Sequence, residues 1–441
     1  MTIEAPVSVP RTQSAAPPAP PGTPTASRRA LIGLGLGNTL EWYDWMVFGL
    51  LASLIGPQFF PNGDRVAATL SALAVFAVGF AMRPLGGVLL GTVADRIGRR
   101  SVMLLSVSVM AATTLVIAVM PTHASIGIGA GIVLLICRLL QGASTGIEAP
   151  LSTSYAVELS PEGREGRAAG LMSFFVNLGI LLASLVSFLT SLIIGADEML
   201  AWGWRVPFAF GAALGVVVIW LRRALPESLT EEERSTHRQE GNTVWGGIRK
   251  HWVGVLAILF VVGAAQAYNY AWNVGLPSLA RGAFGENPTW VFAITTVLAV
   301  VLLIGSPLTG ALADRYRLGR TFLITRLLAI PSVFLMLLYT DKGIWGFAAV
   351  LLGGSVVLVL NMTLYNVVAT SLMPKYCRAT GVALGYGIAV AVFGGTASYF
   401  LVWLQNRGLD WVFPVYVAVL SVISVGVYLA ARKSSGIFCG K

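Results

Sequence analysis

The sequence has 441 residues, of which 56% are hydrophobic and only 11% are charged, with a mean hydropathy of +0.77. Soluble domains carry about 25% charged residues, so this composition excludes an ordinary soluble protein and predicts an all-α integral membrane protein. The formal charge of +10 does not indicate nucleic-acid binding, because Lys and Arg are concentrated in alternate loops between the apolar segments. Three scattered cysteines form neither a disulfide framework nor a metal cluster, so we expect no metal and no cofactor.

Residues 1–28 are rich in Pro, Ala, Ser and Thr and are expected to form a disordered cytoplasmic tail. Hydropathy then predicts twelve transmembrane helices in chain order. They lie near residues 30–56, 66–92, 101–120, 125–156, 166–194, 205–222, 251–281, 289–312, 321–340, 344–371, 379–405 and 411–431. The segment 125–156 is long for one span, so it is expected either to tilt or to begin with an interfacial turn at the Gly-rich residues 127–131.

A hydrophilic stretch at residues 223–250 divides the twelve spans six and six. The predicted units are an N-terminal half at 29–222, this cytoplasmic linker, a C-terminal half at 251–432 and a short cytoplasmic tail at 433–441. The basic residues lie in the loops on the side of both termini, which predicts that both termini are cytoplasmic.

An internal repeat supports the division into two halves. The loop after the second span reads G-T-V-A-D-R-I-G-R-R (residues 91–100), and the loop after the eighth reads G-A-L-A-D-R-Y-R-L-G-R (residues 310–320). Equivalent loops in two six-helix halves indicate a parallel repeat, which is typical of transporters whose halves rock about a central site.

A few charged residues lie within the predicted spans, where each is costly and therefore a functional-site hypothesis. The first span contains Glu41 and Asp44, which share one helix face at positions i and i+3. At 1.5 Å per residue, Asp44 and Arg138 both lie near mid-membrane and are expected to pair. Arg83 and Glu148 lie closer to the cytoplasm and form the expected second pair.

The C-terminal half has no buried acid in this interpretation, so proton handling is expected in the N-terminal half. Its one intramembrane arginine, Arg326, begins about one turn into its span and is expected to extend toward the interface.

Three motifs identify a family resemblance. The loop after the second span, R-L-L-Q-G at residues 138–142 and P-E-S at residues 226–228 resemble signatures of the major facilitator superfamily. Further segments resemble its metabolite:H+ symporter family, and within it the alpha-ketoglutarate permeases. They are G-N-T-L-E-W-Y-D-W (37–45), F-A-M-R-P-L-G-G (80–87), W-G-W-R-V-P-F (202–208) and A-V-F-G-G-T-A (391–397).

One segment departs from the family pattern. Where the family usually has G-G-E followed by an aromatic residue, this chain has G-I-E-A-P at residues 146–150. Pro150 removes a backbone donor and is expected to kink the helix beside Glu148.

The resemblance implies alternating access, with cytoplasmic loop charges that latch the halves in the outward-facing state. The latch residues are expected to form ion-pair clusters within each loop. These residues are Asp95, Arg96, Arg99 and Arg100 in the first copy, and Asp314 with Arg315 in the second.

The buried charges predict a proton switch. Burial raises the pKa of a carboxyl group and a nearby guanidinium lowers it, so Asp44 or Glu41 beside Arg138 is expected to alternate between ion-paired and protonated states. Of the two acids, Asp44 is the favoured coupling residue, and Glu148 is a further candidate. The predicted substrate contacts are Arg138, Arg83, Tyr43, Tyr268, Asn269, Tyr365 and Asn366.

These observations predict a proton-coupled symporter, not an enzyme, that imports a small organic anion such as a mono- or dicarboxylate. Two alternatives stay open: symport of a zwitterionic osmolyte such as proline or betaine, whose amine can use cation–π attraction, and proton antiport of drugs. The expected partners are the substrate, the proton and the lipid bilayer. The protein is expected to be a monomer in the plasma (inner) membrane.

Overall fold

The computed structural model describes residues 24–61, 63–97, 99–146, 165–223, 241–316, 318–339, 343–374 and 377–435. Within these ranges every regular element is a helix. Of the tails predicted at 1–28 and 433–441, residues 1–23 and 436–441 lie outside the described part, as do the linker residues 224–240 and Glu148. Residues 24–28 and 433–435 are helical, so the predicted tail boundaries are wrong by a few residues.

The N-terminal helices follow the predicted spans closely. They are α1 (Pro24–Phe59), α2 (Arg65–Ile97), α3 (Arg99–Val119), α4 (His123–Ile126), α5 (Gly129–Thr145), α7 (Glu165–Ile194), α8 (Ala196–Glu198), the π-turn η1 (Met199–Gly203) and α9 (Arg205–Arg223).

The C-terminal helices begin after α11 (Gly241–Lys250), and two of their spans contain a π-turn. They are α12 (Trp252–Tyr270), η2 (Ala271–Gly275), α13 (Leu276–Gly282), α14 (Pro288–Arg315), α15 (Leu318–Val333), η3 (Phe334–Leu338), α16 (Ile344–Gly353), α17 (Ser355–Ser371), α18 (Arg378–Ala389), η5 (Val390–Gly394), α19 (Gly395–Gln405) and α20 (Val412–Ser435).

Within the described ranges, ten helical segments are long and apolar enough to cross a membrane. The remaining two predicted spans correspond to α1, which carries Glu41 and Asp44, and to α5, which is apolar but has only 17 described residues. The predicted all-α fold of twelve transmembrane helices is therefore confirmed.

The long segment predicted at 125–156 begins with a turn. Gly127 adopts a φ of +59°, which ends the short helix α4 and redirects the chain into α5. A residue with a side chain would be strained in this conformation. Of the two expectations for this segment, the interfacial turn is the one observed.

The two sets of helices pack in equivalent ways, as the internal repeat predicts. In the N-terminal set, α1 packs against α7 and α9, α2 against α5, and α3 against α9. In the C-terminal set, α12 packs against α18 and α20, α14 against α17, and α15 against α20. Each contact in one set matches the contact between the corresponding spans of the other.

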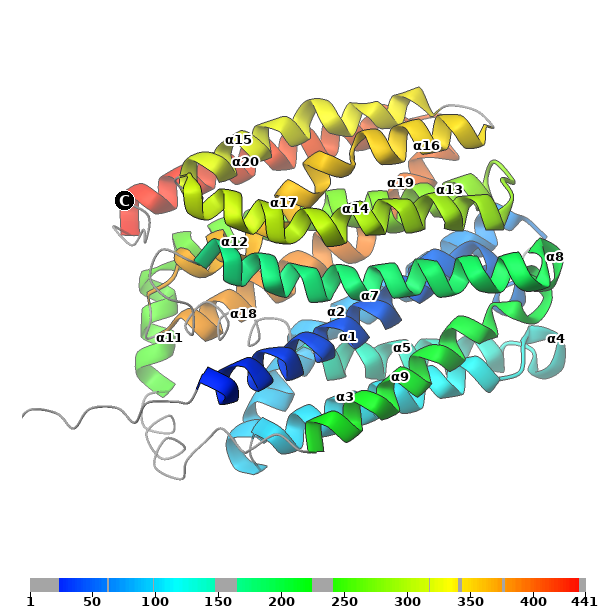
Figure 1. The fold of residues 1–441 in the computed structure, drawn as a ribbon, viewed down its shortest axis with the longest axis horizontal. Coiled ribbons are helices and arrows are strands. Elements are labelled where there is room, and N and C mark those ends of the chain that lie inside the picture. The colour runs from blue at the N-terminus through cyan, green and yellow to red at the C-terminus, as the bar shows by residue number, and fades with distance from the viewer. Residues whose placement is uncertain are drawn as a thin grey trace, which may run out of the picture.

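The start of α1 and the end of α20 lie at one end of the bundle, which we call the termini end, whereas α4, α8 and α13 lie at the opposite end, the far end (Figure 1). The two sets meet along α7 with α14, α2 with α18 to α19, and α1 with η2 and α13. Gly166 on α7 and Gly310 on α14 permit the first contact, because a Cβ at either position would collide with the facing backbone.

Candidate functional site

The first buried charge pair joins α1 to α5. Arg138 donates from Nη1 to Asp44 Oδ2 at 3.1 Å, and both side chains are buried. Asp44 Oδ1 also accepts from the Thr114 hydroxyl at 2.5 Å and from Gln141 Nε2 at 3.1 Å. The pairing of Asp44 with Arg138 that the helix depths predict is therefore present, inside a network contributed by α1, α3 and α5.

The second buried pair differs from the one predicted. Arg83 Nη2 lies 2.9 Å from Glu41 Oε1, so the partner observed for Arg83 is on α1. Glu148, the partner predicted from depth alone, lies outside the described residues. Depth along the membrane does not fix the rotation of a helix, and α1 presents both of its acids to arginines of neighbouring helices.

An aromatic side chain lies between the two arginines. The guanidinium carbon of Arg83 is 4.5 Å from the ring centre of Trp45, and that of Arg138 is 5.7 Å from it and 3.8 Å from the ring of Phe48. Close packing of α2 on α5 places both arginines beside α1, because Gly142 faces the backbone of Gly79 with no room for a side chain. Cation–π contacts therefore supplement the carboxylates in holding each guanidinium.

Several donors of this site have no hydrogen-bond acceptor among the described residues. They include Nε and Nη2 of Arg138 and Nε of Arg83, all fully buried. Because a buried polar atom is normally paired, these N–H groups are available to an additional acceptor.

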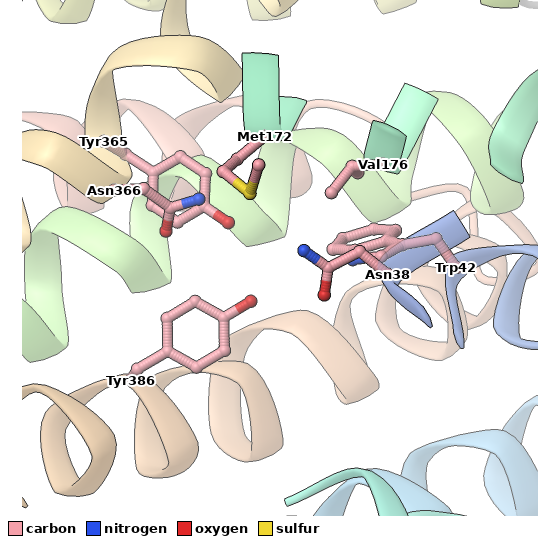
Figure 2. Close-up of a pocket in the computed structure, with 7 residues that line it drawn as sticks. All are labelled: Asn38, Trp42, Met172, Val176, Tyr365, Asn366 and Tyr386. Carbon is pink, nitrogen blue, oxygen red and sulfur yellow. The ribbon is translucent and has the colours of Figure 1, made fainter. Parts of the chain in front are cut away.

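A small cavity lies between α1, α7, α17 and α18. Its volume is about 20 Å³, measured as the space open to the centre of a water-sized sphere, which holds roughly one or two water molecules. Figure 2 shows the amide of Asn38 and the hydroxyls of Tyr365 and Tyr386 directed toward this space. The lining residues are Asn38, Trp42, Met172, Val176, Tyr365, Asn366 and Tyr386.

Two of the predicted substrate contacts, Tyr365 and Asn366, line this cavity. The other predicted aromatic and amide contacts, Tyr43, Tyr268 and Asn269, do not line it. Tyr43 faces α9, where its hydroxyl donates to the Pro207 carbonyl at 2.6 Å. Tyr268 faces α15 and α16, where its hydroxyl lies 2.6 Å from Ser332 Oγ.

Asn269 is also absent from the cavity lining. Its amide lies 3.4 Å from Gln266 Oε1 and accepts from Asn273 Nδ2 at 2.9 Å. Gln266 in turn donates to the Tyr365 hydroxyl at 3.1 Å, so Asn269 is connected to the cavity only through other side chains.

The sequence-based prediction missed Asn38 and Tyr386 as lining residues. One signal was present for Asn38, since it precedes Glu41 by three residues and therefore shares its helix face. Tyr386 is on α18, which packs against α2, the helix that carries Arg83. Two lining residues are thus related to the Arg83–Glu41 pair, Asn38 through the face of α1 and Tyr386 through the packing of α18 on α2. The sequence-based prediction had centred the site on Asp44 and Arg138.

Aromatic rings connect the two halves beside the cavity. Trp42 on α1 stacks on Tyr270 of α12, with ring centres 6.1 Å apart and planes within 8°. Phe80 on α2 contacts the same tyrosine at 5.1 Å. The Tyr270 hydroxyl has no hydrogen-bond partner among the described residues and lies near Arg83.

At the termini end, Asp314 joins the two halves. Its carboxylate accepts from the backbone N–H groups of Gly166 and Arg167 at 2.7 and 3.2 Å, and lies 3.6 Å from Arg167 Nε. The predicted pairing of Asp314 with Arg315 is wrong, because the carboxylate faces the first turn of α7 and Arg315 instead stacks on Tyr316.

The first copy of the predicted latch consists of Asp95, Arg96, Arg99 and Arg100. The side chains of these four residues lie outside the part of the chain that the structure describes.

Two arginines of the C-terminal half are buried against expectation. Arg326 does not extend toward the interface; it is 1% exposed and donates from Nη2 to the Val261 carbonyl at 2.8 Å. Arg281, the last residue of the seventh predicted span, is fully buried on α13. Hydropathy missed Arg281 because it lies at the end of an apolar segment, where a charge ordinarily marks the interface.

Comparisons with known proteins agree with this architecture. A sequence profile of the Major Facilitator Superfamily matches residues 34–398. The proton:xylose symporter XylE, solved with 6-bromo-6-deoxy-D-glucose, superimposes with a TM-score of 0.73 over 93% of this chain and 96% of that chain. Its sequence identity is 17%, so this similarity concerns the fold alone.

Three curated relatives cover most of the chain. The alpha-ketoglutarate permease of Escherichia coli (strain K12) is 32% identical over 415 residues, which are 92% of this chain and 94% of that protein. The citrate-proton symporter of Salmonella typhi is 31% identical over 379 residues, 85% and 87% of the two chains. The proline/betaine transporter of Salmonella typhimurium is 29% identical over 428 residues, 92% and 84%. The chain therefore belongs to the Major Facilitator Superfamily of membrane transporters.

Proposed function

We propose that the protein is a proton-coupled symporter that imports a small organic anion, such as a mono- or dicarboxylate, by alternating access. The observation that carries the proposal is the Asp44–Arg138 pair, in which a single N–H of the guanidinium meets the carboxylate. Nε and Nη2 of Arg138 have no acceptor among the described residues, so a substrate carboxylate can bind two N–H groups of one guanidinium. The relatives named alpha-ketoglutarate permease and citrate-proton symporter support this substrate class.

The proton acts at Asp44 in this mechanism. A proton bound at Oδ2 neutralises the carboxylate and removes the acceptor of Arg138 Nη1. The substrate carboxylate then replaces Asp44 as the counterion of the guanidinium. When both leave on the opposite side, Asp44 and Arg138 pair again. Coupling requires that the substrate bind the protonated form more tightly than the ionised form.

The Arg83–Glu41 pair has a second role in the proposal. Arg83 is close enough to the cavity to interact electrostatically with Tyr270 and Tyr386, and its Nε has no acceptor among the described residues. We assign Arg83 to a second carboxylate of the substrate, with Tyr365 and Asn366 as neutral contacts. The cavity holds about one or two waters, so the substrate requires a state in which the helices have moved apart.

The balance of buried charge supports an anion. Among the described residues, six arginines are buried but only two acids, Glu41 and Asp44. The buried arginines are Arg83, Arg138, Arg222, Arg281, Arg326 and Arg378. An anionic substrate offsets part of this excess, whereas a cationic drug would add to it.

One observation favours a second candidate, a zwitterionic osmolyte. The cavity lining contains no charged side chain but three aromatic rings, those of Trp42, Tyr365 and Tyr386. Such rings can hold a quaternary or secondary amine by cation–π attraction. The similarity to proline/betaine transporters is nearly as strong as that to the carboxylate permeases.

We further propose that the termini end faces the cytoplasm and that the protein works as a monomer in the inner membrane. The support is the concentration of Lys and Arg in the loops of that end.

Uptake into proteoliposomes tests the proposal. Purified protein is reconstituted and given radiolabelled mono- and dicarboxylates, proline, betaine and a cationic drug, with and without an inward proton gradient. We expect gradient-dependent accumulation of an organic anion and an accompanying rise of internal proton concentration. Accumulation of proline or betaine alone would establish the second candidate instead, and uptake without proton movement would contradict symport.

A further inference from the structure

Arg281 lies at the junction of the two halves near the far end. It is fully buried on α13, and its guanidinium bonds to α1 of the other half. Nε donates to Ser53 Oγ at 3.1 Å, and Nη2 donates to the Leu50 carbonyl. The ring of Phe292 lies 4.6 Å from the guanidinium carbon.

The charge of Arg281 has no counterion in the described part of the chain. None of the ion pairs found there includes it, and its Nη1 has no hydrogen-bond acceptor. Neutral oxygens and an aromatic face compensate a buried guanidinium only in part. In this respect Arg281 differs from Arg83 and Arg138, which both contact carboxylates.

The segment that carries Arg281 closes the far end. It follows the π-turn η2, and its Ser278 hydroxyl lies 3.4 Å from the Gly49 carbonyl of α1. Gly282 lies against Thr69 of α2 and Ser53 of α1. Opening the far end must therefore separate α13 from α1 and break both bonds of Arg281.

Once the guanidinium of Arg281 is released from Leu50 and Ser53, it lies between the open far end and the central site. Arg65 is exposed at the start of α2, one turn before Thr69, the residue that Gly282 of α13 faces, and the exposed Asp64 precedes it. Leu50 follows Asp44 by six residues, which is about 9 Å along α1. Because it bonds to Leu50 and Ser53, Arg281 lies between the far end and the arginines of the central site.

We propose that Arg281 is an anion-capture site: when the far end is open, its guanidinium binds the carboxylate of the incoming substrate, and when the far end is closed, Leu50 and Ser53 occupy it. This inference rests on the proposed function, because it requires that the substrate be an organic anion. The planar N–H groups fit a carboxylate with two parallel bonds.

Initial rates of uptake in proteoliposomes test the capture site. Arg281→Gln keeps a polar side chain but removes the charge, and we expect its KM for a dicarboxylate to rise on the order of tenfold or more while kcat changes by less than about twofold. Arg407→Gln is the matched control, because Arg407 is exposed at the far end and stacks on Trp403 outside this junction. Its KM is expected to stay at the wild-type value.

Ser53→Ala provides a test that leaves the arginine intact. The variant removes the acceptor of Nε from the closed state, so the guanidinium is released more easily and the KM for the same dicarboxylate is expected to fall roughly twofold to fivefold. A residue that only holds the two halves together would lower KM in both variants, because each favours the open far end. A higher KM in Arg281→Gln together with a lower KM in Ser53→Ala is therefore specific to a capture site.

The outcomes separate the two proposals. Wild-type uptake of organic anions with an unchanged KM in Arg281→Gln, or with an unchanged or higher KM in Ser53→Ala, would overturn the capture site and leave the proposed function standing. Failure of the wild-type protein to take up any organic anion would overturn both.

Discussion

Two buried arginines from each half of the molecule are held in different ways. In the N-terminal half, Arg138 and Arg83 each contact a carboxylate on α1. In the C-terminal half, Arg281 and Arg326 donate to backbone carbonyls, those of Leu50 and Val261. A carboxylate can be neutralised by a proton and a backbone carbonyl cannot, so of these four arginines Arg83 and Arg138 are the ones whose described partners a proton can remove.

The C-terminal half contributes a different chemistry to the central cavity. Its lining side chains are neutral and polar, namely Tyr365, Asn366 and Tyr386. Gln266 orients the Tyr365 hydroxyl with a bond of 3.1 Å. In the proposed mechanism this contrast is a division of labour, in which the N-terminal half supplies the groups that change charge and bind carboxylates and the C-terminal half supplies neutral contacts.

Loss of the carboxylate at Asp44 is expected to have the largest effect. Asp44→Asn keeps an oxygen for Thr114 and Gln141 but leaves Arg138 without its counterion, which costs about 3–5 kcal/mol for a buried pair. We expect proton-driven accumulation to fall to background, while exchange of labelled for unlabelled substrate persists because it needs no net proton movement. Uptake and counterflow in the same proteoliposomes measure both.

Asp64→Asn is the control for this substitution, since Asp64 is exposed and, among the described residues, its carboxylate accepts from the Val66 N–H. Accumulation at the wild-type level in Asp44→Asn would show that Asp44 is not the coupling acid. Glu41→Gln would then become the decisive variant.

An arginine-to-lysine substitution in each half, at Arg138 and at Arg326, provides the second prediction. Arg138→Lys keeps the charge but removes the planar fork, and loss of one charged hydrogen bond of about 1.5–3 kcal/mol corresponds to roughly a tenfold to 100-fold lower kcat/KM. Arg326→Lys is expected to retain transport, because a lysine ammonium can still donate to the Val261 carbonyl. Initial uptake rates at several substrate concentrations measure the difference.

Equal losses in the two lysine variants would contradict the division of labour, because they would give Arg326 the same dependence on guanidinium geometry. Detergent gel filtration of both variants excludes misfolding as the cause.

The sequence allowed most of the fold to be predicted, because hydropathy and helix length determine where a chain can span a membrane. The turn at Gly127 was anticipated from the glycine-rich stretch before α5. The repeated loop motif also predicted the equivalence of the two sets of helices. These features depend on local composition, which a single sequence contains.

Contacts of the site could be predicted only where the depth of two residues in the membrane was enough to identify them as partners. Depth predicted Asp44 with Arg138, but it did not identify Glu41 as a partner of Arg83. Tyr43 is adjacent to Asp44 in sequence yet faces α9, because consecutive residues on a helix point about 100° apart. Helix rotation and tertiary packing decide these contacts, and neither is encoded in hydropathy.

Tyr365→Phe tests the neutral contacts that the C-terminal half contributes to the cavity, and we expect a moderate effect on substrate affinity. The variant removes the hydroxyl that faces the cavity and accepts from Gln266, at a cost of about 0.5–1.5 kcal/mol for a neutral hydrogen bond. We expect KM to rise roughly twofold to tenfold with proton coupling unchanged. Tyr43→Phe is the matched control, because its hydroxyl bonds to Pro207 away from the cavity. A change in the proton-to-substrate ratio of Tyr365→Phe would contradict a purely neutral role.

Asp314→Asn is expected to have the smallest effect, although it alters a carboxylate of the C-terminal half. An asparagine oxygen can still accept from the Gly166 N–H, and the ion pair that is lost involves Arg167, whose side chain is 61% exposed. An exposed pair contributes at most about 1 kcal/mol, so opening of the termini end is expected to increase by no more than about fivefold. Distances between spin labels at Arg223 and Lys433 measure this opening, with wild-type substrate accumulation as the expected companion result. Loss of accumulation as complete as in Asp44→Asn would place a coupling acid in the C-terminal half, and the contrast between the two halves would then no longer hold.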